Sequence, residues 1–351
     1  MMKAVTLSVR VVKLVIMRNL CGLFSLGWGL LSGTLFAATP YRLENEIKVG
    51  GEGGWDYLSV DAPAHRLYVS HGNTIVVIDM QKNSVVGEIA DTPGVHGIAS
   101  AGDLKKGFST NGRENKVGVV DLVSLKTVTK IETGANPDGM LYVPGIHEVY
   151  IFNGRGQSAT VIDARENKAI ATIPLNGKPE FAAFDESAGR VFNNLEDKSE
   201  LVAIDTKTHA VANRWPIAPG EEASGLAYDA KNHRLFLGCG NKMMVMMDSV
   251  TGKVVDHVAI GDGVDATSFD PGTQLAFASC GDGTVTIAHE DSPDHLTVVQ
   301  TLKTERGART MTLDPETHKI YLASAKFQEP APGERRGRMV AGSFKVLVYG
   351  N

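Results

Sequence analysis

The segment Thr74-Ile75-Val76-Val77-Ile78-Asp79 is an apolar, β-branched run that ends in an aspartate, and this pattern recurs along the chain. The aspartates that end the five runs are Asp79, Asp121, Asp163, Asp205 and Asp248, at intervals of 42, 42, 42 and 43 residues. Repeats of this length with strands inside them are typical of a β-propeller, in which one repeat is one four-stranded blade. The sequence therefore predicts an all-β propeller.

The number of repeats predicts seven blades. A second apolar run opens on a basic residue, as in Arg66-Leu67-Tyr68-Val69 and Arg234-Leu235-Phe236-Leu237. The innermost strands are expected to begin near Asp56, His96, Asp138, Glu180, Ser224, Asp265 and Arg309. The last repeat supplies only three strands, the third at 343–349, and residues 41–47 form an unmatched strand at the front. We expect that N-terminal strand to pair with the C-terminal blade and close the ring.

Residues 1–38 have the composition of a secretory signal peptide. They contain no acidic residue, carry Lys3, Arg10, Lys13 and Arg18, and continue as an apolar stretch to Phe36 before Ala37-Ala38. We expect the signal to be cleaved and the protein to be periplasmic or secreted. Residues 39–351 would then form one propeller domain. A Pro/Gly-rich insertion at 327–342 would form a loop in the last blade.

The charge balance limits the possible partners. Removing the signal leaves 31 Lys+Arg against 40 Asp+Glu, a formal charge of −9. This charge argues against broad attraction to nucleic acid or anionic lipid. No apolar stretch after the signal is long enough to span a membrane. We expect a monomer whose partner is a small molecule or a protein.

Cys239 and Cys280 are the two cysteines that remain after residue 38, and they occupy equivalent positions in successive repeats. Equivalent points on packed sheets lie about 10 Å apart, which is too far for an undistorted disulfide. The sequence therefore favours two free, semi-buried thiols over a disulfide or a thiolate site.

The repeat resembles a known family. Arg66-Leu67-Tyr68-Val69-Ser70, the run from Asn73 to Asp79, and Val85-Val86-Gly87-Glu88-Ile89 resemble the YVTN-type β-propeller repeat, which includes exported YncE-like proteins. In this chain the tetrapeptide itself is Tyr68-Val69-Ser70-His71. The resemblance covers essentially the whole chain after the signal and implies export and a role in binding or interaction. Related seven-bladed folds include metal-dependent lactonases and lyases.

Polar residues predict where a site would lie. In a propeller, the loops that lead into the innermost strands share one channel mouth with the loops between the second and third strands of each blade. The candidate binding residues at these positions are Trp55, Asp56, His71, His96, Asp138, Asn153, Glu180, Asn194, Asp265 and Arg309. This set contains more carboxylates than a structural lining needs.

Three functions remain open from the residues and from the resemblance together. The first is a non-catalytic binding module that uses this channel mouth. The second is a metal-assisted lactonase or lyase, in which His71, His96 and Asp56 would bind a divalent metal ion, Glu180 or His96 would act as general base, and Arg309 would hold an anionic substrate. The third is an accessory subunit of a periplasmic redox system.

Overall fold

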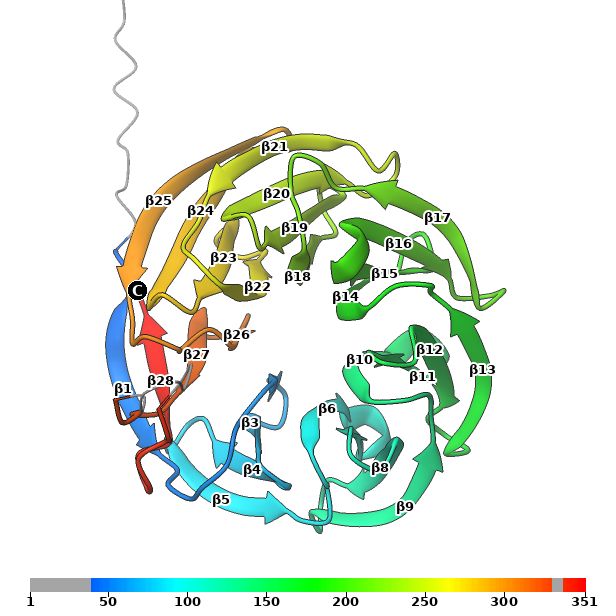
Figure 1. The fold of residues 1–351 in the computed structure, drawn as a ribbon, viewed down its shortest axis with the longest axis vertical. Helices are drawn as coiled ribbons and strands as arrows, with labels where there is room; N and C mark the ends of the chain where they lie inside the picture. The colour runs from blue at the N-terminus through cyan, green and yellow to red at the C-terminus, as the bar shows by residue number, and fades with distance from the viewer. Residues whose placement is uncertain (1–38, 330–336) are drawn as a thin grey trace, which may run out of the picture. The chain divides into compact units, whose positions relative to one another are not determined.

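The computed structural model describes residues 39–329 and 337–351, which form seven four-stranded antiparallel sheets arranged in a ring (Figure 1). The predicted seven-bladed propeller is confirmed. The predicted signal peptide and residues 330–336 of the predicted loop insertion lie outside the described residues. In the part of the chain that the structure describes, no helix has the length and apolar character needed to cross a membrane.

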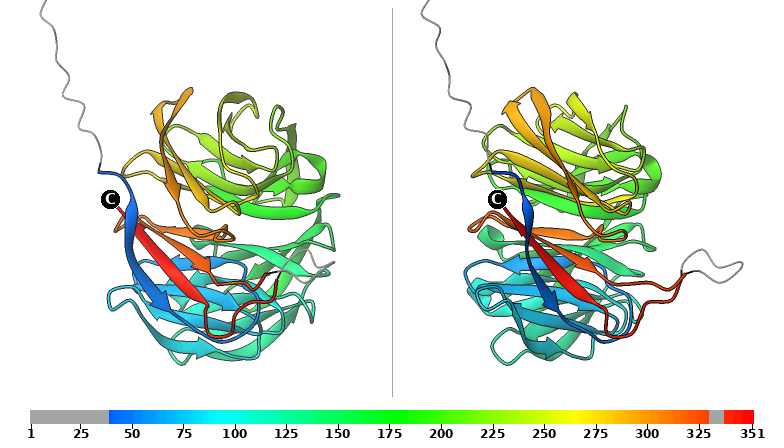
Figure 2. Two further views of the ribbon diagram at one scale, coloured as in Figure 1. Left: turned by 60° about the vertical axis from the view of Figure 1, so that its left-hand side comes forward. Right: turned by 90° about the vertical axis from the view of Figure 1, so that its left-hand side faces the viewer.

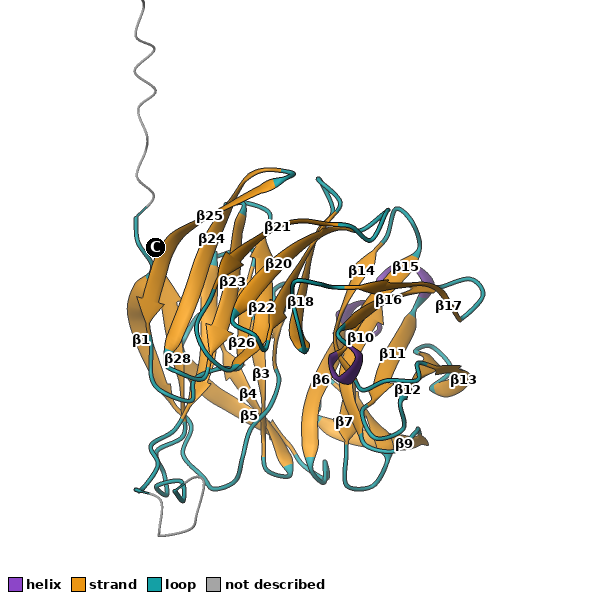
Figure 3. Ribbon diagram, turned by 45° about the horizontal axis from the view of Figure 1, so that its top comes forward, coloured by secondary structure: helices purple, strands orange, loops and turns teal. Residues whose placement is uncertain are grey.

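Six blades are built from consecutive strands, ordered from the central axis outward. The first two blades contain β2 (Leu58–Asp61), β3 (Arg66–His71), β4 (Thr74–Asp79), β5 (Ser84–Ile89), β6 (Val95–Ala101), β7 (Lys106–Asn111), β8 (Lys116–Asp121) and β9 (Lys126–Glu132). The next two contain β10 (Pro137–Val143), β11 (Glu148–Asn153), β12 (Ser158–Asp163), β13 (Lys168–Pro174), β14 (Pro179–Asp185), β15 (Arg190–Leu195), β16 (Glu200–Asp205) and β17 (Ala210–Pro216). The fifth and sixth contain β18 (Ala223–Asp229), β19 (Arg234–Cys239), β20 (Met243–Asp248), β21 (Val254–Ala259), β22 (Val264–Asp270), β23 (Leu275–Cys280), β24 (Thr284–Ser292) and β25 (His295–Lys303). Figure 3 shows how little helix accompanies these strands; the described helices are the single 3₁₀ turns η1 (Gly102–Leu104), η2 (Pro144–Ile146) and η3 (Glu196–Lys198).

The seventh blade joins the two ends of the propeller. It contains β26 (Met311–Asp314), β27 (Lys319–Ser324) and β28 (Lys345–Gly350), with β1 (Arg42–Lys48) as the outermost strand. Strand β1 pairs antiparallel with β28, and the two run side by side in both views of Figure 2. The Tyr41 hydroxyl donates a hydrogen bond to the carbonyl oxygen of His318 at 2.6 Å. The predicted closure by the N-terminal strand is therefore confirmed.

The repeating aspartates cap the turn between the third and fourth strands of their blades. In Asp79, Asp121, Asp163, Asp205 and Asp248, Oδ1 accepts hydrogen bonds at 2.7–3.1 Å from the backbone N–H groups two and three residues later. A short side-chain acceptor at this position fixes the turn geometry. The period that identified the fold is thus the spacing of equivalent turn caps.

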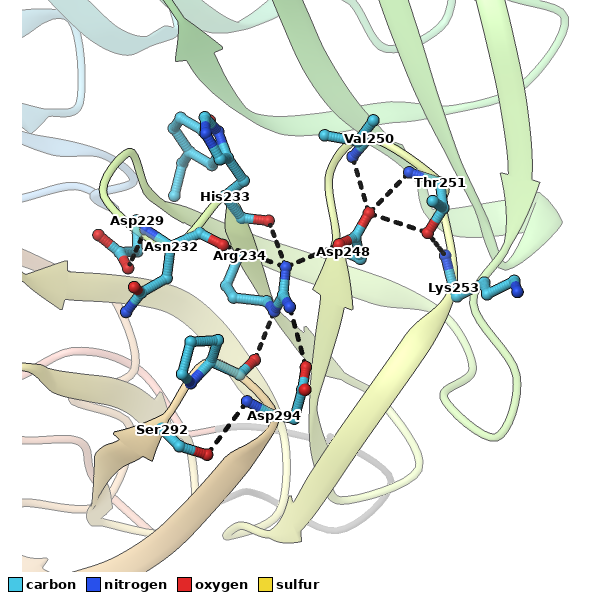
Figure 4. A network of polar contacts seen from close by, with 12 residues as sticks. Asp229, Asn232, His233, Arg234, Asp248, Val250, Thr251, Lys253, Ser292 and Asp294 are labelled. Carbon is cyan, nitrogen blue, oxygen red and sulfur yellow. Dashed lines mark hydrogen bonds and ion pairs between the residues drawn. The ribbon is translucent and has the colours of Figure 1, made fainter. Parts of the chain in front are cut away.

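Basic residues at the start of the second strand tie neighbouring blades together. Arg66 Nη1 donates to the Leu122 carbonyl at 2.5 Å, and Lys106 Nζ donates to the Ala164 carbonyl at 2.8 Å, each in the next blade. Arg234 contacts two carboxylates (Figure 4). It pairs with Asp248 at 2.7 Å in its own blade and with Asp294 at 2.9 Å in the next blade. The basic residue of the basic-then-apolar pattern therefore makes a contact with the next blade.

The hydrophobic core is divided into layers between adjacent blades. One layer, for example, contains Phe108 and Val119 of the second blade with Ile151 and Ile162 of the third. Cys239 and Cys280 are buried in different layers, and both thiols are free, as predicted. Burial raises the pKa of each thiol to about 12, so neither is a ready thiolate.

Two buried carboxyl groups meet between the fifth and sixth blades. Glu290 is 1% exposed; its Oε1 accepts a hydrogen bond from Asn232 at 3.2 Å, and its carboxyl group also hydrogen-bonds with that of Asp229. Burial and the negative charge of Asp229 raise the pKa of Glu290 to about 7, against a smaller opposing effect of Arg234. The folded protein therefore holds a proton on Glu290 that the unfolded chain has already lost near neutral pH.

We expect Glu290→Gln to stabilise the protein at pH 8 and not at pH 5. Because the pKa of Glu290 is raised in the folded protein, the free energy of unfolding decreases as pH rises from about 4.5 to about 7 and is level above that. Glutamine does not titrate, so the variant does not lose this free energy at high pH. The gain at pH 8 should be about 1–2 kcal/mol in the free energy of unfolding, measured by urea denaturation at both pH values. Glu166→Gln, at an exposed position, is the control and should differ from the parent equally at both pH values. A Glu290→Gln difference that does not change with pH would contradict the assignment.

Candidate functional site

The innermost strands carry the candidate site residues at their second position. In β6, β10, β14 and β22 these residues are His96, Asp138, Glu180 and Asp265, and Figure 1 shows these strands around the central axis. Each of these strands has a β-bulge that spans its second position, since its pairing with the next strand shifts between its first and fourth residues. A bulge redirects the side chains of its unpaired residues. The fold therefore turns one polar side chain per blade towards the same channel mouth.

Asp56, His96 and Asp138 form a compact group from three successive blades. His96 Nδ1 lies 2.7 Å from Asp56 Oδ2 and 3.3 Å from Asp138 Oδ1. One ligand atom from each residue lies within 4.8 Å of the other two. Burial alone lowers the pKa of His96, but the hydrogen bond with Asp56 and the charges of both carboxylates outweigh it and raise the pKa to about 9. The three side chains form an ion-paired trio at neutral pH.

A second polar group completes the ring of side chains. Lys178 Nζ lies 2.6 Å from Glu180 Oε1 and also pairs with Glu196. Burial raises the pKa of Glu180 to about 8, although the bond to Lys178 acts in the opposite direction. Asp265 accepts a hydrogen bond from the Thr310 hydroxyl at 2.5 Å and lies 3.8 Å from Arg309 Nε.

These side chains line one cavity of about 210 Å³. Its lining includes Asp56, Asp138, Glu180, Glu196, Asp265, Lys178 and Arg309, and we call this set, with His96, the acidic mouth. Burial also raises the pKa of Asp138, to about 6, and that of Asp265. Burial is the main cause of these raised pKa values, and the neighbouring carboxylates add to it.

Two aromatic rings form the floor of this cavity. Tyr57 and Phe181 pack with ring centroids 4.6 Å apart. Both rings line the acidic cavity and also a second cavity of about 350 Å³ that continues towards the opposite face. The Tyr57 hydroxyl is buried and has no hydrogen-bond partner among the described residues. Its pKa is raised by burial and by the charges of Asp138, Glu180, Asp56 and Asp265, which places the hydroxyl among the four carboxyl groups.

A wider cavity of about 540 Å³ lies beside the trio. Trp55, Asp56, His96, Asn136 and the two arginines Arg113 and Arg155 contribute to its lining. Trp55 also stacks on Phe344 with ring centroids 5.1 Å apart, so it is a packed rim residue that exposes one edge to the cavity. Asp56 thus lines both this cavity and the acidic one, whereas His96 lines this cavity.

The structure does not bring together all three members of the predicted metal set of His71, His96 and Asp56. His71 lies at the end of β3 and is buried, and its ring stacks on Phe344 with centroids 4.2 Å apart. Burial lowers its pKa. The third member of the described group is Asp138, because the bulge in β10 turns that carboxylate towards His96, whereas the end of β3 faces the aromatic residues of the seventh blade.

Two predicted binding residues serve the framework instead. Asn153 is fully buried and donates to Ser158 at 3.1 Å and to Thr160 at 3.0 Å within its own blade. Asn194 is also fully buried and donates to the carbonyl groups of Ser224 and Gly225 in the next blade. Neither amide lines the acidic cavity, because side chains on the second strand point between the blades.

Sequence reasoning missed two residues of the site. Tyr57 follows Asp56 directly, and a polar-aromatic residue at the start of an innermost strand could have been read as a channel-filling group. Lys178 lies two residues before Glu180, and an i, i+2 pair of opposite charge on an extended strand points to one face. Trp55, Asp56, His96, Asp138, Glu180, Asp265 and Arg309 do meet at the predicted channel mouth.

Comparison with known proteins supports the fold. No protein-family model matches the sequence, and no curated protein matches it either. Among solved structures, the chain is similar to a chain titled hydrazine synthase from Kuenenia stuttgartiensis, with a TM-score of 0.68 and 17% sequence identity, over 81% of this chain and 96% of that chain. At this identity the similarity shows the shared β-propeller fold alone.

Proposed function

We propose that this protein is an exported YVTN-type propeller that acts as a non-catalytic binding module, with its ligand site at the acidic mouth. The ligand is a polar small molecule with a positively charged group. The observation that carries the proposal is the convergence of side chains from six blades on one cavity of about 210 Å³ above an aromatic floor. Export is supported by the composition of residues 1–38 and by the family resemblance.

The charge of the ligand follows from the electrostatics of the cavity. The acidic mouth contains five carboxyl groups, namely Asp56, Asp138, Glu180, Glu196 and Asp265, and three basic side chains, namely His96, Lys178 and Arg309. Burial, and to a smaller extent the neighbouring carboxylates, raises the pKa of Asp138, Glu180 and Asp265. A positive charge in the cavity would favour the ionised carboxylates, whereas an anion would add to the repulsion.

A metal-assisted hydrolase or lyase is the second candidate, and the specific observation in its favour is the Asp56–His96–Asp138 trio. That reading requires a metal ion, a nearby general base and a group that binds the substrate. Glu180 in the acidic mouth and Arg113 or Arg155 in the adjoining cavity are of suitable type.

A size-matched pair of probes tests the binding proposal. We expect n-butylammonium to bind at least ten times more tightly than butyrate in isothermal titration calorimetry. Asp265→Asn should weaken n-butylammonium about tenfold, because a charged hydrogen-bonding partner contributes on the order of 1.5 kcal/mol. Asp265 is chosen because it lines the cavity and lies outside the trio.

The control for this experiment is Asp103→Asn. Asp103 lines the cavity of about 980 Å³ near the opposite ends of the innermost strands and should not affect the affinity for n-butylammonium. Equal binding of butyrate and n-butylammonium, or equal effects of the two substitutions, would show that the acidic mouth is not the site.

A further inference from the structure

We propose that Asp56, His96 and Asp138 bind one divalent transition-metal ion within the acidic mouth. This inference goes beyond the proposed function, because it assigns a metal ion to the trio in addition to the organic cation. The ligand atoms would be His96 Nδ1 and one carboxylate oxygen from each aspartate. The sequence-based set contained His71 in place of Asp138, so the site is one that the structure defines.

The present geometry is close to that of a metal site. The His96 Nδ1 atom lies 2.7 Å from Asp56 Oδ2 and 3.3 Å from Asp138 Oδ1, and all three ligand atoms are within 4.8 Å of one another. Ligands at about 2.0–2.2 Å from a tetrahedral ion lie on the order of 3–3.5 Å apart. Movements of less than about 1 Å would therefore bring the three atoms to coordinating positions.

Neighbouring groups hold Asp56 and His96 in place. The Asp56 N–H donates to Ser70 Oγ at 2.8 Å, and the Tyr57 N–H donates to the His96 carbonyl at 2.9 Å. A Cβ at Gly112 would lie 2.6 Å from His96 Nε2, so the imidazole fits closely against that glycine. Asn136 also hydrogen-bonds to His96. With Nε2 enclosed in this way, Nδ1 is the nitrogen that faces the two carboxylates.

A second feature points to a ligand that the protein does not itself supply. The Tyr57 hydroxyl is buried among the carboxyl groups of the same cavity and has no hydrogen-bond partner in the described chain. A buried hydroxyl without a partner in the described chain calls for one that the protein does not supply, such as a water molecule or a ligand in this cavity.

The donor set selects the class of metal. One imidazole nitrogen with two carboxylate oxygens suits Zn²⁺ and similar transition ions, whereas Ca²⁺ prefers six to eight oxygen ligands. With three protein ligands, an ion here would keep a position open towards the cavity.

Calorimetry with metal salts alone tests the inference. Full-length mature protein stripped with a chelator should bind one Zn²⁺ per chain at least 100-fold more tightly than Ca²⁺, and Co²⁺ should give visible absorption bands typical of low coordination. Asp138→Asn should weaken Zn²⁺ at least tenfold and remove the Co²⁺ bands. Circular dichroism and the thermal unfolding midpoint should show that this variant is folded. His96→Gln provides a second, independent loss of a ligand.

The chain contains a matched control. Asp103 and His147 form another aspartate–histidine contact, at 3.2 Å, that has no third ligand in the described residues. Asp103→Asn should leave Zn²⁺ binding unchanged. Absence of stoichiometric Zn²⁺, or equal Zn²⁺ binding by Asp138→Asn and the parent, would overturn the metal site. If n-butylammonium still binds in an Asp265-dependent way, the proposed function stands and only the metal fails.

Discussion

Ile47→Asp is expected to lower the free energy of unfolding by about 3–5 kcal/mol, because it places an unpaired charge in the seam that closes the ring. Ile47 is 2% exposed and packs in a layer that combines residues of the first and seventh blades. Strand β1 reaches its blade through non-covalent pairing with β28. Urea denaturation followed by tryptophan fluorescence measures the change.

Leu43→Asp provides the control on the same strand. The Leu43 side chain is 46% exposed, so a charge there remains in water, and the effect should be within about 0.5 kcal/mol. If the two substitutions were equally mild, closure by β1 would contribute little to the stability of the ring.

Arg234→Ala is expected to lower the free energy of unfolding by about 2–4 kcal/mol. The largely buried guanidinium pairs with Asp248 and Asp294 and donates to the carbonyl of Pro293, so its removal leaves groups on two blades without their partner (Figure 4). Arg234→Lys should recover only part of the loss, because an ammonium cannot reproduce the planar fork. Thermal and urea unfolding both report the change.

Arg165→Ala is the comparison for the Arg234 prediction. Arg165 is exposed in the turn between β12 and β13, and we expect its replacement to change the free energy of unfolding by no more than about 0.5 kcal/mol. Full recovery by Arg234→Lys would indicate that charge alone, and not the forked geometry, links the two blades.

The fold could be predicted because its signal is local and repeated. Each blade needs an acceptor at the same turn, and Asp79 and its four equivalents supply it. Closure of the ring followed from the three-stranded last repeat and the unmatched strand at residues 41–47. Neither inference depends on how side chains pack, and both were confirmed.

The site was harder to predict because its geometry depends on β-bulges that change which way a side chain points. Alternation along β10 does not show that Asp138 turns towards His96, and alternation along β3 does not show that His71 turns towards Phe344. Asparagine is a residue type that often binds ligands, yet the Asn194 amide donates a hydrogen bond to a backbone carbonyl group of the next blade. The polar residues of the repeats predicted which channel mouth would carry a site. Which of these residues line the cavity depends on how the side chains pack.

The aromatic floor made by Tyr57 and Phe181 has a consequence for the route by which a ligand enters and leaves the cavity. Both residues line the acidic cavity and the cavity beneath it, so a ligand moving along the axis from one cavity to the other would have to pass their rings. Exchange through the acidic mouth avoids this contact. A protein that docks over that mouth would therefore compete with ligand exchange, whichever of the two binds first.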